Sequence, residues 1–165
     1  DGMRRAALHI ITGGRDSGKT ARIRALYDEK PGGDGYACPK VFANGVHEGY
    51  DALNLRTGAT APLARKKNAL PLGWDEFLAR GEYSFSGRGL EFLDSILEGL
   101  AARRAERVFL DEIGSLEMQR EGFRFLLAGV MDSCEELYAS VRRNRVAEFV
   151  EITGAVDYTL TDLDA

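Results

Sequence analysis

The sequence predicts an α/β fold in which a mostly parallel sheet is covered by helices on both faces, with a β-hairpin inserted after the first helix. Short apolar stretches typical of buried strands alternate along the chain with stretches whose apolar residues recur at helical spacing. The 165 residues, 44% of them hydrophobic and 29% charged, suit a single globular domain with a well-buried core. Because neither a linker nor an internal repeat divides the chain, we expect one domain over residues 1–165.

The first strand and the first helix are separated by a glycine-rich turn. Residues 7–12, ALHIIT, form the apolar run of a buried strand. Residues 21–30 have helical spacing, with Ile23 and Leu26 on one face. Pro31 and the glycines that follow it cannot continue a helix, so we expect the helix to end there.

The next part of the chain is β-like. We expect strands at residues 36–42 and 50–55, and Asn44-Gly45 between them is a hairpin turn signal. Residues 59–81 show no readable period, and we expect irregular structure there.

The second half alternates strands with two strongly amphipathic helices, and Ser86 is a plausible cap for the first of them. In chain order we expect a strand at 82–86, a helix at 89–106, a strand at 107–112, a helix at 120–136, a strand at 137–141, a helix at 143–153 and a strand at 156–160.

The turn after the first strand, GGRDSGKT at residues 13–20, fits the P-loop pattern G-x-x-x-x-G-K-[ST] and lies between a strand and a helix, as that motif requires. Gly13 and Gly18 let the backbone wrap a phosphate, and the loop N–H groups and the helix N-terminus attract the anion. We expect Lys19 at the β- and γ-phosphates and the Thr20 hydroxyl on Mg²⁺. The fold is then the three-layer α/β/α sandwich of P-loop NTPases, with nucleotide contacts from Gly13, Gly14, Arg15, Asp16, Ser17, Gly18, Lys19, Thr20 and Ala21.

A second motif, VFLDE at residues 108–112, is an apolar strand that ends in two acids. A strand beside the P-loop strand can deliver a carboxylate to the Mg²⁺ shell, and we assign Asp111 to that role. Glu112 is then placed to polarise the attacking water as general base. The structural alternative for Glu112 is an acid that interacts with a helix dipole.

Three arginines, Arg142, Arg143 and Arg145, follow the predicted strand at 137–141. Strand carboxyl ends face the ligand crevice in open α/β sheets, so one of the three can stabilise charge on the γ-phosphate. We take Arg142 as the catalytic candidate, with a solvated face or a structural salt bridge as the alternative.

Other polar and aromatic residues have weaker functional interpretations. The basic run at residues 65–67 is expected to be solvated, and His9 and His47 lack metal-ligand partners and are expected to be structural. Trp74 and Tyr83 are candidates for stacking on a base, although core packing would use the same residues.

The net charge, the cysteine content and the lack of a long apolar run limit which partners and which cellular setting we expect for the chain. A net charge of −4 argues against a protein that coats nucleic acid. Cys38 and Cys134 are far apart, without a C-x-x-C pattern, so we expect neither a disulfide scaffold nor a zinc site, and a reducing, cytoplasmic setting fits best. No apolar run approaches the roughly 18 residues of a membrane span, so we expect no membrane partner. The sequence identifies no protein partner.

Taken together, HIITGGRDSGKT and the later VFLDEIGSLEM resemble the THEP-type nucleoside-triphosphatases, also called cancer-related nucleoside-triphosphatases. The second motif of that family reads roughly Asp-Glu-Ile-Gly-x-Met-Glu, and here Leu116 stands in place of the methionine. Residues 48–65, EGYDALNLRTGATAPLAR, and residues 81–92, GEYSFSGRGLEF, are similar to further family segments. The resemblance covers most of the chain.

The resemblance implies a P-loop domain of the additional-strand class and Mg²⁺-dependent hydrolysis of ATP, GTP and other nucleoside triphosphates. It implies phosphate contacts for residues 13–20, metal and water contacts for Asp111 and Glu112, and a site role for Glu117. The chain departs from the family at Ala21, where a second threonine is usual, and in YTLTDLDA, where family members tend to have a Thr-x-x-Asn-Arg segment. These departures leave the base preference open.

Two other functions remain alternatives to a hydrolase. In a nucleotide or small-molecule kinase, residues 36–85 would form the acceptor pocket and the arginines at 142–145 would serve as a lid. In a non-catalytic GTP- or ATP-binding switch, nucleotide would order a loop that contacts a partner, with the hairpin as the partner surface.

Overall fold

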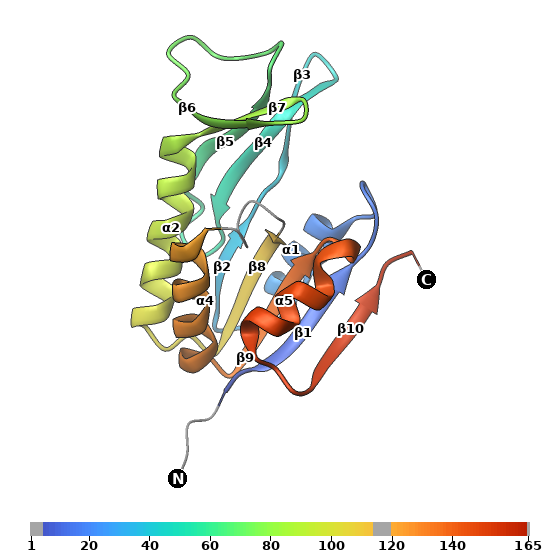
Figure 1. The fold of residues 1–165 in the computed structure, drawn as a ribbon, viewed down its shortest axis with the longest axis vertical. Coiled ribbons are helices and arrows are strands. Elements are labelled where there is room, and N and C mark those ends of the chain that lie inside the picture. Colours follow the sequence, from blue (N-terminus) through green and yellow to red (C-terminus); the bar gives the residue numbers. More distant parts are fainter. Residues whose placement is uncertain (1–4, 114–119, 165) are drawn as a thin grey trace.

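The computed structural model describes residues 5–113 and 120–164, and at Glu112 and Ile113 it describes the backbone alone. Within these ranges one ten-stranded sheet runs through the molecule (Figure 1). Half of the sheet is parallel. Its five neighbouring strands are, in order, β10 (Tyr158–Asp162), β1 (Ala7–Thr12), β9 (Glu136–Val141), β8 (Arg107–Ile113) and β2 (Gly33–Ala37).

The other half is an antiparallel extension of the same sheet that projects beyond β2 (Figure 1). Its row consists of β4 (Val46–Asn54), β5 (Thr60–Lys66), β7 (Tyr83–Ser86) and β6 (Glu76–Arg80), and β3 (Lys40–Ala43) pairs with β4 beside the row. The predicted hairpin is therefore the β3–β4 part of a larger insertion. Its turn has φ values of 52° at Asn44 and 77° at Gly45, as a two-residue hairpin turn requires.

The expectation of irregular structure at residues 59–81 is wrong, because this stretch contains β5 and β6. Three successive residues of β5, Leu63, Ala64 and Arg65, are buried, so the strand lacks the alternation of buried and exposed residues that marks a strand in sequence. Arg65 is buried because its guanidinium is paired with Asp51 at 2.8 Å and bonded to two backbone carbonyls. The expectation that this arginine is solvated is therefore also wrong.

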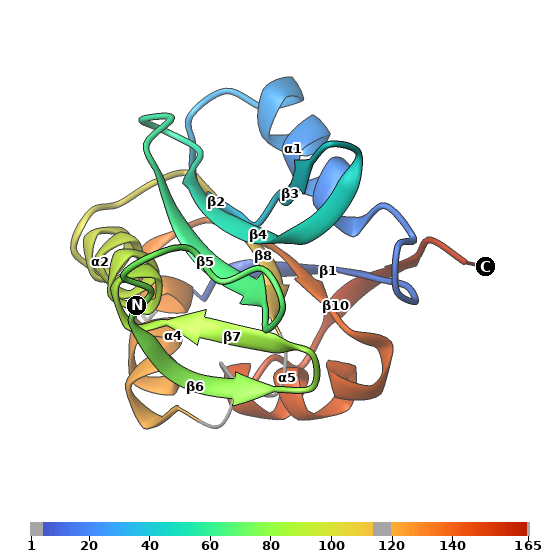
Figure 2. The ribbon, with the colours of Figure 1, turned by 90° about the horizontal axis from the view of Figure 1, so that it is seen from above.

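Helices cover both faces of the sheet. Figure 2 shows α1 (Lys19–Glu29) on one face, and α2 (Gly87–Ala102), α4 (Glu121–Ser133) and α5 (Val146–Thr153) on the other. A short 3₁₀ helix, η1 (Arg143–Arg145), precedes α5. Ser86 caps α2 as predicted, since its Oγ accepts a hydrogen bond from the N–H of Gly89 at 3.1 Å. The predicted three-layer α/β/α fold is confirmed.

Two apolar clusters hold the layers together. The larger one packs α2, α4 and α5 on the sheet, with Leu97, Leu127 and Phe149 buried in it. The smaller one, built around Ile23 and Phe109, fixes α1 and therefore the loop that precedes it. In the ranges 5–113 and 120–164 no helix has the length and apolar character needed to cross a membrane.

Candidate functional site

The loop between β1 and α1 lies at the edge of the sheet where the parallel strands have their carboxyl ends, which is where open α/β sheets bind ligands. A cavity of about 710 Å³ opens there. Its lining comes from residues 13–21 of the loop and α1, from β3, from Tyr50 in β4, and from residues 142–144 after β9. All nine predicted nucleotide contacts thus border one cavity.

The loop backbone needs its glycines at two places. A Cβ on Gly13 would lie 2.3 Å from the Oγ and 2.8 Å from the Cβ of Ser17, so a side chain there would displace Ser17. Gly18 has φ of 92°, in the left-handed region that favours glycine. The Ser17 hydroxyl is buried, and it has no hydrogen-bond partner among the residues that the structure describes. This tight turn ends at Gly18, directly before the first residue of α1.

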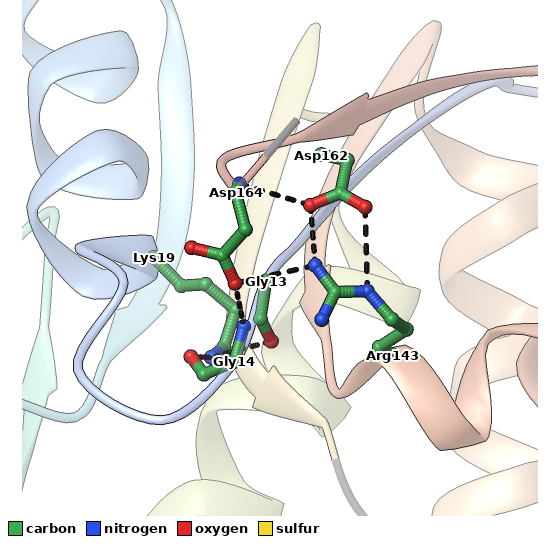
Figure 3. Close-up of polar contacts among 6 residues, drawn as sticks. All are labelled: Gly13, Gly14, Lys19, Arg143, Asp162 and Asp164. Carbon is green, nitrogen blue, oxygen red and sulfur yellow. Dashed lines mark hydrogen bonds and ion pairs between the residues drawn. The ribbon is translucent and has the colours of Figure 1, made fainter.

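Lys19 is folded back over this loop (Figure 3). Its side chain is buried, and its Nζ donates hydrogen bonds to the carbonyl oxygens of Gly14 at 2.9 Å and Gly13 at 3.3 Å. Two backbone carbonyls of the loop therefore hold the ammonium in place.

Asp111 and Thr20, the two predicted metal ligands, meet beside the loop. The Thr20 hydroxyl donates a hydrogen bond to Asp111 Oδ2 at 2.8 Å. Asp111 is fully buried and accepts two more hydrogen bonds, from the Ser140 hydroxyl at 2.6 Å and from the N–H of Cys38 at 2.9 Å. Three elements, α1, β9 and the link after β2, thus fix this carboxylate. Sequence reasoning missed both Ser140 and Cys38, although Ser140 is a polar residue in an otherwise apolar strand.

The rim of the loop is tied to the antiparallel extension. Arg15 and Asp16 are exposed, and Asp16 forms an ion pair with Lys40 of β3. The Lys40 ammonium holds the pKa of the Asp16 carboxyl below its ordinary value. The hairpin therefore closes one side of the cavity.

The structure separates the three arginines after β9. Arg143 is paired with Asp162 at 2.5 Å and with Asp164 at 3.2 Å, and Arg145 with Glu148 at 3.2 Å. Arg142 lines the cavity and forms no salt bridge with any residue that the structure describes.

Two other predicted site residues fall outside the described atoms. The backbone of Glu112 continues β8 from Asp111, but its side chain is not among the described groups, and Glu117 lies outside the described residues altogether.

The aromatic candidates do not border the cavity. Trp74 donates a hydrogen bond from Nε1 to Ser84, and the ring of Tyr83 packs 5.6 Å from that of Tyr50. The aromatic residues that line the cavity are Phe42 and Tyr50 of the extension, which no sequence signal distinguished.

The two histidines make contacts within the sheet, as predicted. His9 is hydrogen-bonded to Glu136 at 3.0 Å and to Thr159 at 2.8 Å, and its ring stacks on Tyr138. His47 is bonded to the carbonyl of Gly49 at 3.0 Å.

Comparison with known proteins gives consistent matches. The model of a protein family described as NTPase matches residues 9–163. Nucleoside-triphosphatase THEP1 of Pyrobaculum calidifontis is 29% identical over 139 residues, which are 82% of this chain and 74% of that protein. The crystal structure of THEP1 from the hyperthermophile Aquifex aeolicus has a TM-score of 0.73 at 22% identity and covers 94% of this chain and 89% of its own. The solution structure of a human cancer-related nucleoside triphosphatase has a TM-score of 0.68 at 21% identity, with coverage of 95% and 88%.

At these identities the two solved structures show that the fold is shared. The family match runs from β1 to the segment after β10, so it takes in the loop at residues 13–20, β8 and the strands between them. The chain therefore belongs to this NTPase family and is a nucleoside triphosphatase, as the resemblance of its motifs implied.

Proposed function

We propose that the chain uses Mg²⁺ to hydrolyse ATP, GTP and other nucleoside triphosphates to the diphosphate and phosphate, with the triphosphate on residues 13–21. The observation that carries this proposal is the contact between Thr20 and Asp111, which are 91 residues apart in sequence and meet beside the buried Lys19. A hydroxyl, a carboxylate and an ammonium brought together at a glycine loop are the groups that phosphoryl transfer requires. Lys19 and Thr20 come from α1 and Asp111 comes from β8, and the contact between these elements supports the prediction of a single domain.

The oxygen atoms present suit Mg²⁺. This ion takes hard oxygen ligands and commonly uses one or two protein groups, with waters and substrate phosphates completing its shell. Thr20 and Asp111 supply such oxygens next to the loop, and they would hold the ion. When bound, Mg²⁺ neutralises charge on the β- and γ-phosphates.

Lys19 and Arg142 would stabilise the charge that spreads over the γ-phosphate oxygens in the transition state. Lys19 is already held at the loop by two carbonyl oxygens, so little reorganisation is needed for its ammonium to reach a phosphate. Arg142 is the arginine of the three whose guanidinium is not committed to a described carboxylate, which supports its assignment.

Glu112 would activate the attacking water. It directly follows Asp111 in β8, near the carboxyl end of that strand. The water oxygen forms a bond to the γ-phosphorus while the bond from that phosphorus to the bridging oxygen breaks, and the water proton passes to the Glu112 carboxylate. The diphosphate leaves with the bridging oxygen.

The family assignment favours this reaction over the kinase and the non-catalytic switch. The test is phosphate release from ATP, GTP, CTP and UTP with and without Mg²⁺, in the wild type, in Glu112→Gln and in the control Glu91→Gln, an exposed glutamate of α2. We expect Glu112→Gln to lower kcat by about 10² to 10⁴ with binding retained, and Glu91→Gln to match the wild type.

An undiminished rate in Glu112→Gln would remove Glu112 as the base. If the chain binds all four nucleotides but releases phosphate from none of them, the hydrolase proposal is overturned, and the kinase and the switch become the leading alternatives.

A further inference from the structure

The segment after β10 lies against the start of the loop at residues 13–20, here called the phosphate loop (Figure 3). The N–H of Leu163, the residue after β10, donates a hydrogen bond of 2.8 Å to the carbonyl of Thr12, the last residue of β1, and so extends the pairing of the two strands by one residue of the chain after β10. The Leu163 side chain packs on the smaller apolar cluster, against the face that also carries α1. The pairing of this segment with β1 therefore places the next residue, Asp164, beside the loop.

The Asp164 carboxylate binds one peptide group of the loop. Its Oδ2 accepts a hydrogen bond of 2.6 Å from the N–H of Gly14. That N–H belongs to the same peptide group as the carbonyl of Gly13, whose oxygen accepts a hydrogen bond from Lys19 Nζ at 3.3 Å. In a trans peptide the N–H and the C=O point in opposite directions. The Gly13–Gly14 peptide is thus held at one end by a carboxylate and at the other by the Lys19 ammonium.

Asp164 is fixed in turn by its neighbours. Arg143 Nη2 lies 3.2 Å from Asp164 Oδ2 and 2.5 Å from Asp162 Oδ1 (Figure 3). The N–H of Asp164 also donates to Asp162 Oδ1 at 3.0 Å. The hydrogen bond from Gly14 and then that from Arg143 hold the pKa of Asp164 below its ordinary value of 3.8, so the carboxylate is charged at neutral pH.

The peptide between Gly13 and Gly14 needs contacts of this kind to keep one orientation. Glycine restricts the backbone least of all residues, so nothing within Gly13 and Gly14 opposes rotation of the peptide between them. If that peptide turned, its carbonyl would no longer face Lys19, and the ammonium would lose one of the two acceptors that hold it.

We propose that Asp164 is a positioning residue for Lys19, which acts by fixing the orientation of the Gly13–Gly14 peptide. The inference rests on the proposed function, because it assumes that Lys19 contacts the phosphates. Arg143 has a supporting role here as the group that holds Asp164, and not as a contact to the γ-phosphate.

The experiment measures, by calorimetry with Mg²⁺, the Kd of a non-hydrolysable ATP analogue for the full chain and its variants. The variants are Asp164→Ala, Asp164→Asn, Lys19→Ala, the double variant Asp164→Ala with Lys19→Ala, and the control Asp157→Ala, an exposed aspartate just before β10. We expect Asp164→Ala to weaken binding about tenfold, the order of one charge-assisted hydrogen bond. Asp164→Asn should recover most of this loss, since its amide oxygen still accepts the Gly14 N–H, and Asp157→Ala should bind like the wild type.

The double variant decides the route of the effect. If Asp164 acts through Lys19, its removal should change nothing further once Lys19 is absent. The same fold-loss in both backgrounds, or an Asp164→Ala affinity equal to that of Asp157→Ala, would overturn the proposal. An unchanged affinity in Lys19→Ala would overturn the phosphate-site assignment itself, which distinguishes the two failures.

Folding is controlled separately. The thermal midpoints of Asp164→Ala and Asp157→Ala are compared first. If Asp164→Ala does not fold, Arg143→Gln replaces it in the same cycle, because it removes the guanidinium that holds Asp164 and leaves the Gly14 hydrogen bond in place. A smaller loss that again disappears in the Lys19→Ala background would support the proposal, and a loss that persists there would overturn it.

Discussion

Replacement of Gly35 by alanine is expected to separate β2 from β8, the strand that carries Asp111. Gly35 lies in β2 opposite Phe109 of β8, with φ of 141°. A Cβ at this position would be 1.9 Å from the carbonyl oxygen of Phe109 and 2.8 Å from its backbone nitrogen and carbonyl carbon. Because all three atoms belong to the backbone, no side-chain rotation can relieve the clash. The strands must move apart at the point where β8 leads to Asp111.

The expected cost follows from two contributions. A non-glycine residue held at this φ costs about 1–3 kcal/mol. The loss of pairing between β2 and β8 adds to this, and we expect a total of more than about 4 kcal/mol. Gly45→Ala is the matched control, because Gly45 also has a positive φ of 77° but nothing lies within 4 Å of its added Cβ. It should cost about 1–2 kcal/mol.

Urea denaturation followed by circular dichroism measures both variants. A free energy of unfolding for Gly35→Ala within about 1 kcal/mol of that for Gly45→Ala would refute the reasoning, since it would mean that the β2–β8 backbone yields to the added carbon without loss.

Two further predictions concern titrating groups. Burial raises the pKa of the Cys134 thiol to about 12. We therefore expect Cys134 to resist alkylation near neutral pH in the native protein and to react in urea-unfolded protein. An alkylated Cys134 in mass spectra of the native sample would contradict this. Hydrogen bonding to Arg143 lowers the pKa of Asp162 below its ordinary 3.8. Such a group stabilises the fold above that value and stops doing so as pH falls through its folded pKa. The difference in unfolding free energy between wild type and Arg143→Gln should therefore be full at neutral pH and shrink in acid, and urea titrations showing an equal difference at both would count against it.

The elements that sequence could predict are those whose signal is local. The strand at 7–12, the loop at 13–20 and the predicted strand at 107–112 are each defined by neighbouring residues: an apolar run, two spaced glycines, or two acids after an apolar run. The stretch at 59–81 has no such signal. Arg65 is buried and forms an ion pair with Asp51 in another strand. The alternation of polar and apolar residues along one strand cannot predict a partner in a different strand.

The site shows the same division. The chemistry of Thr20 and Asp111 follows from residue type and place in a motif, whereas the groups that hold Asp111, the N–H of Cys38 and the hydroxyl of Ser140, are 73 and 29 residues away from it. Strand order brings these groups together in space, because β8 lies between β2 and β9. Strand order is therefore the information that a list of motifs lacks.

The partners of the arginines after β9 also depend on strand order. In sequence, Arg142 and Arg143 are adjacent, and nothing distinguishes them as candidates for the γ-phosphate. The acids that pair with Arg143 are Asp162 and Asp164, which lie 19 and 21 residues further on, at the end of β10 and just after it. In the sheet, β10 is separated from β9 by β1. A carboxylate of this segment then binds the loop itself, through Gly14. Arg143 is thus tied to the loop at residues 13–20 through the segment after β10, and this tie depends on strand order rather than on the residues next to Arg143 in sequence.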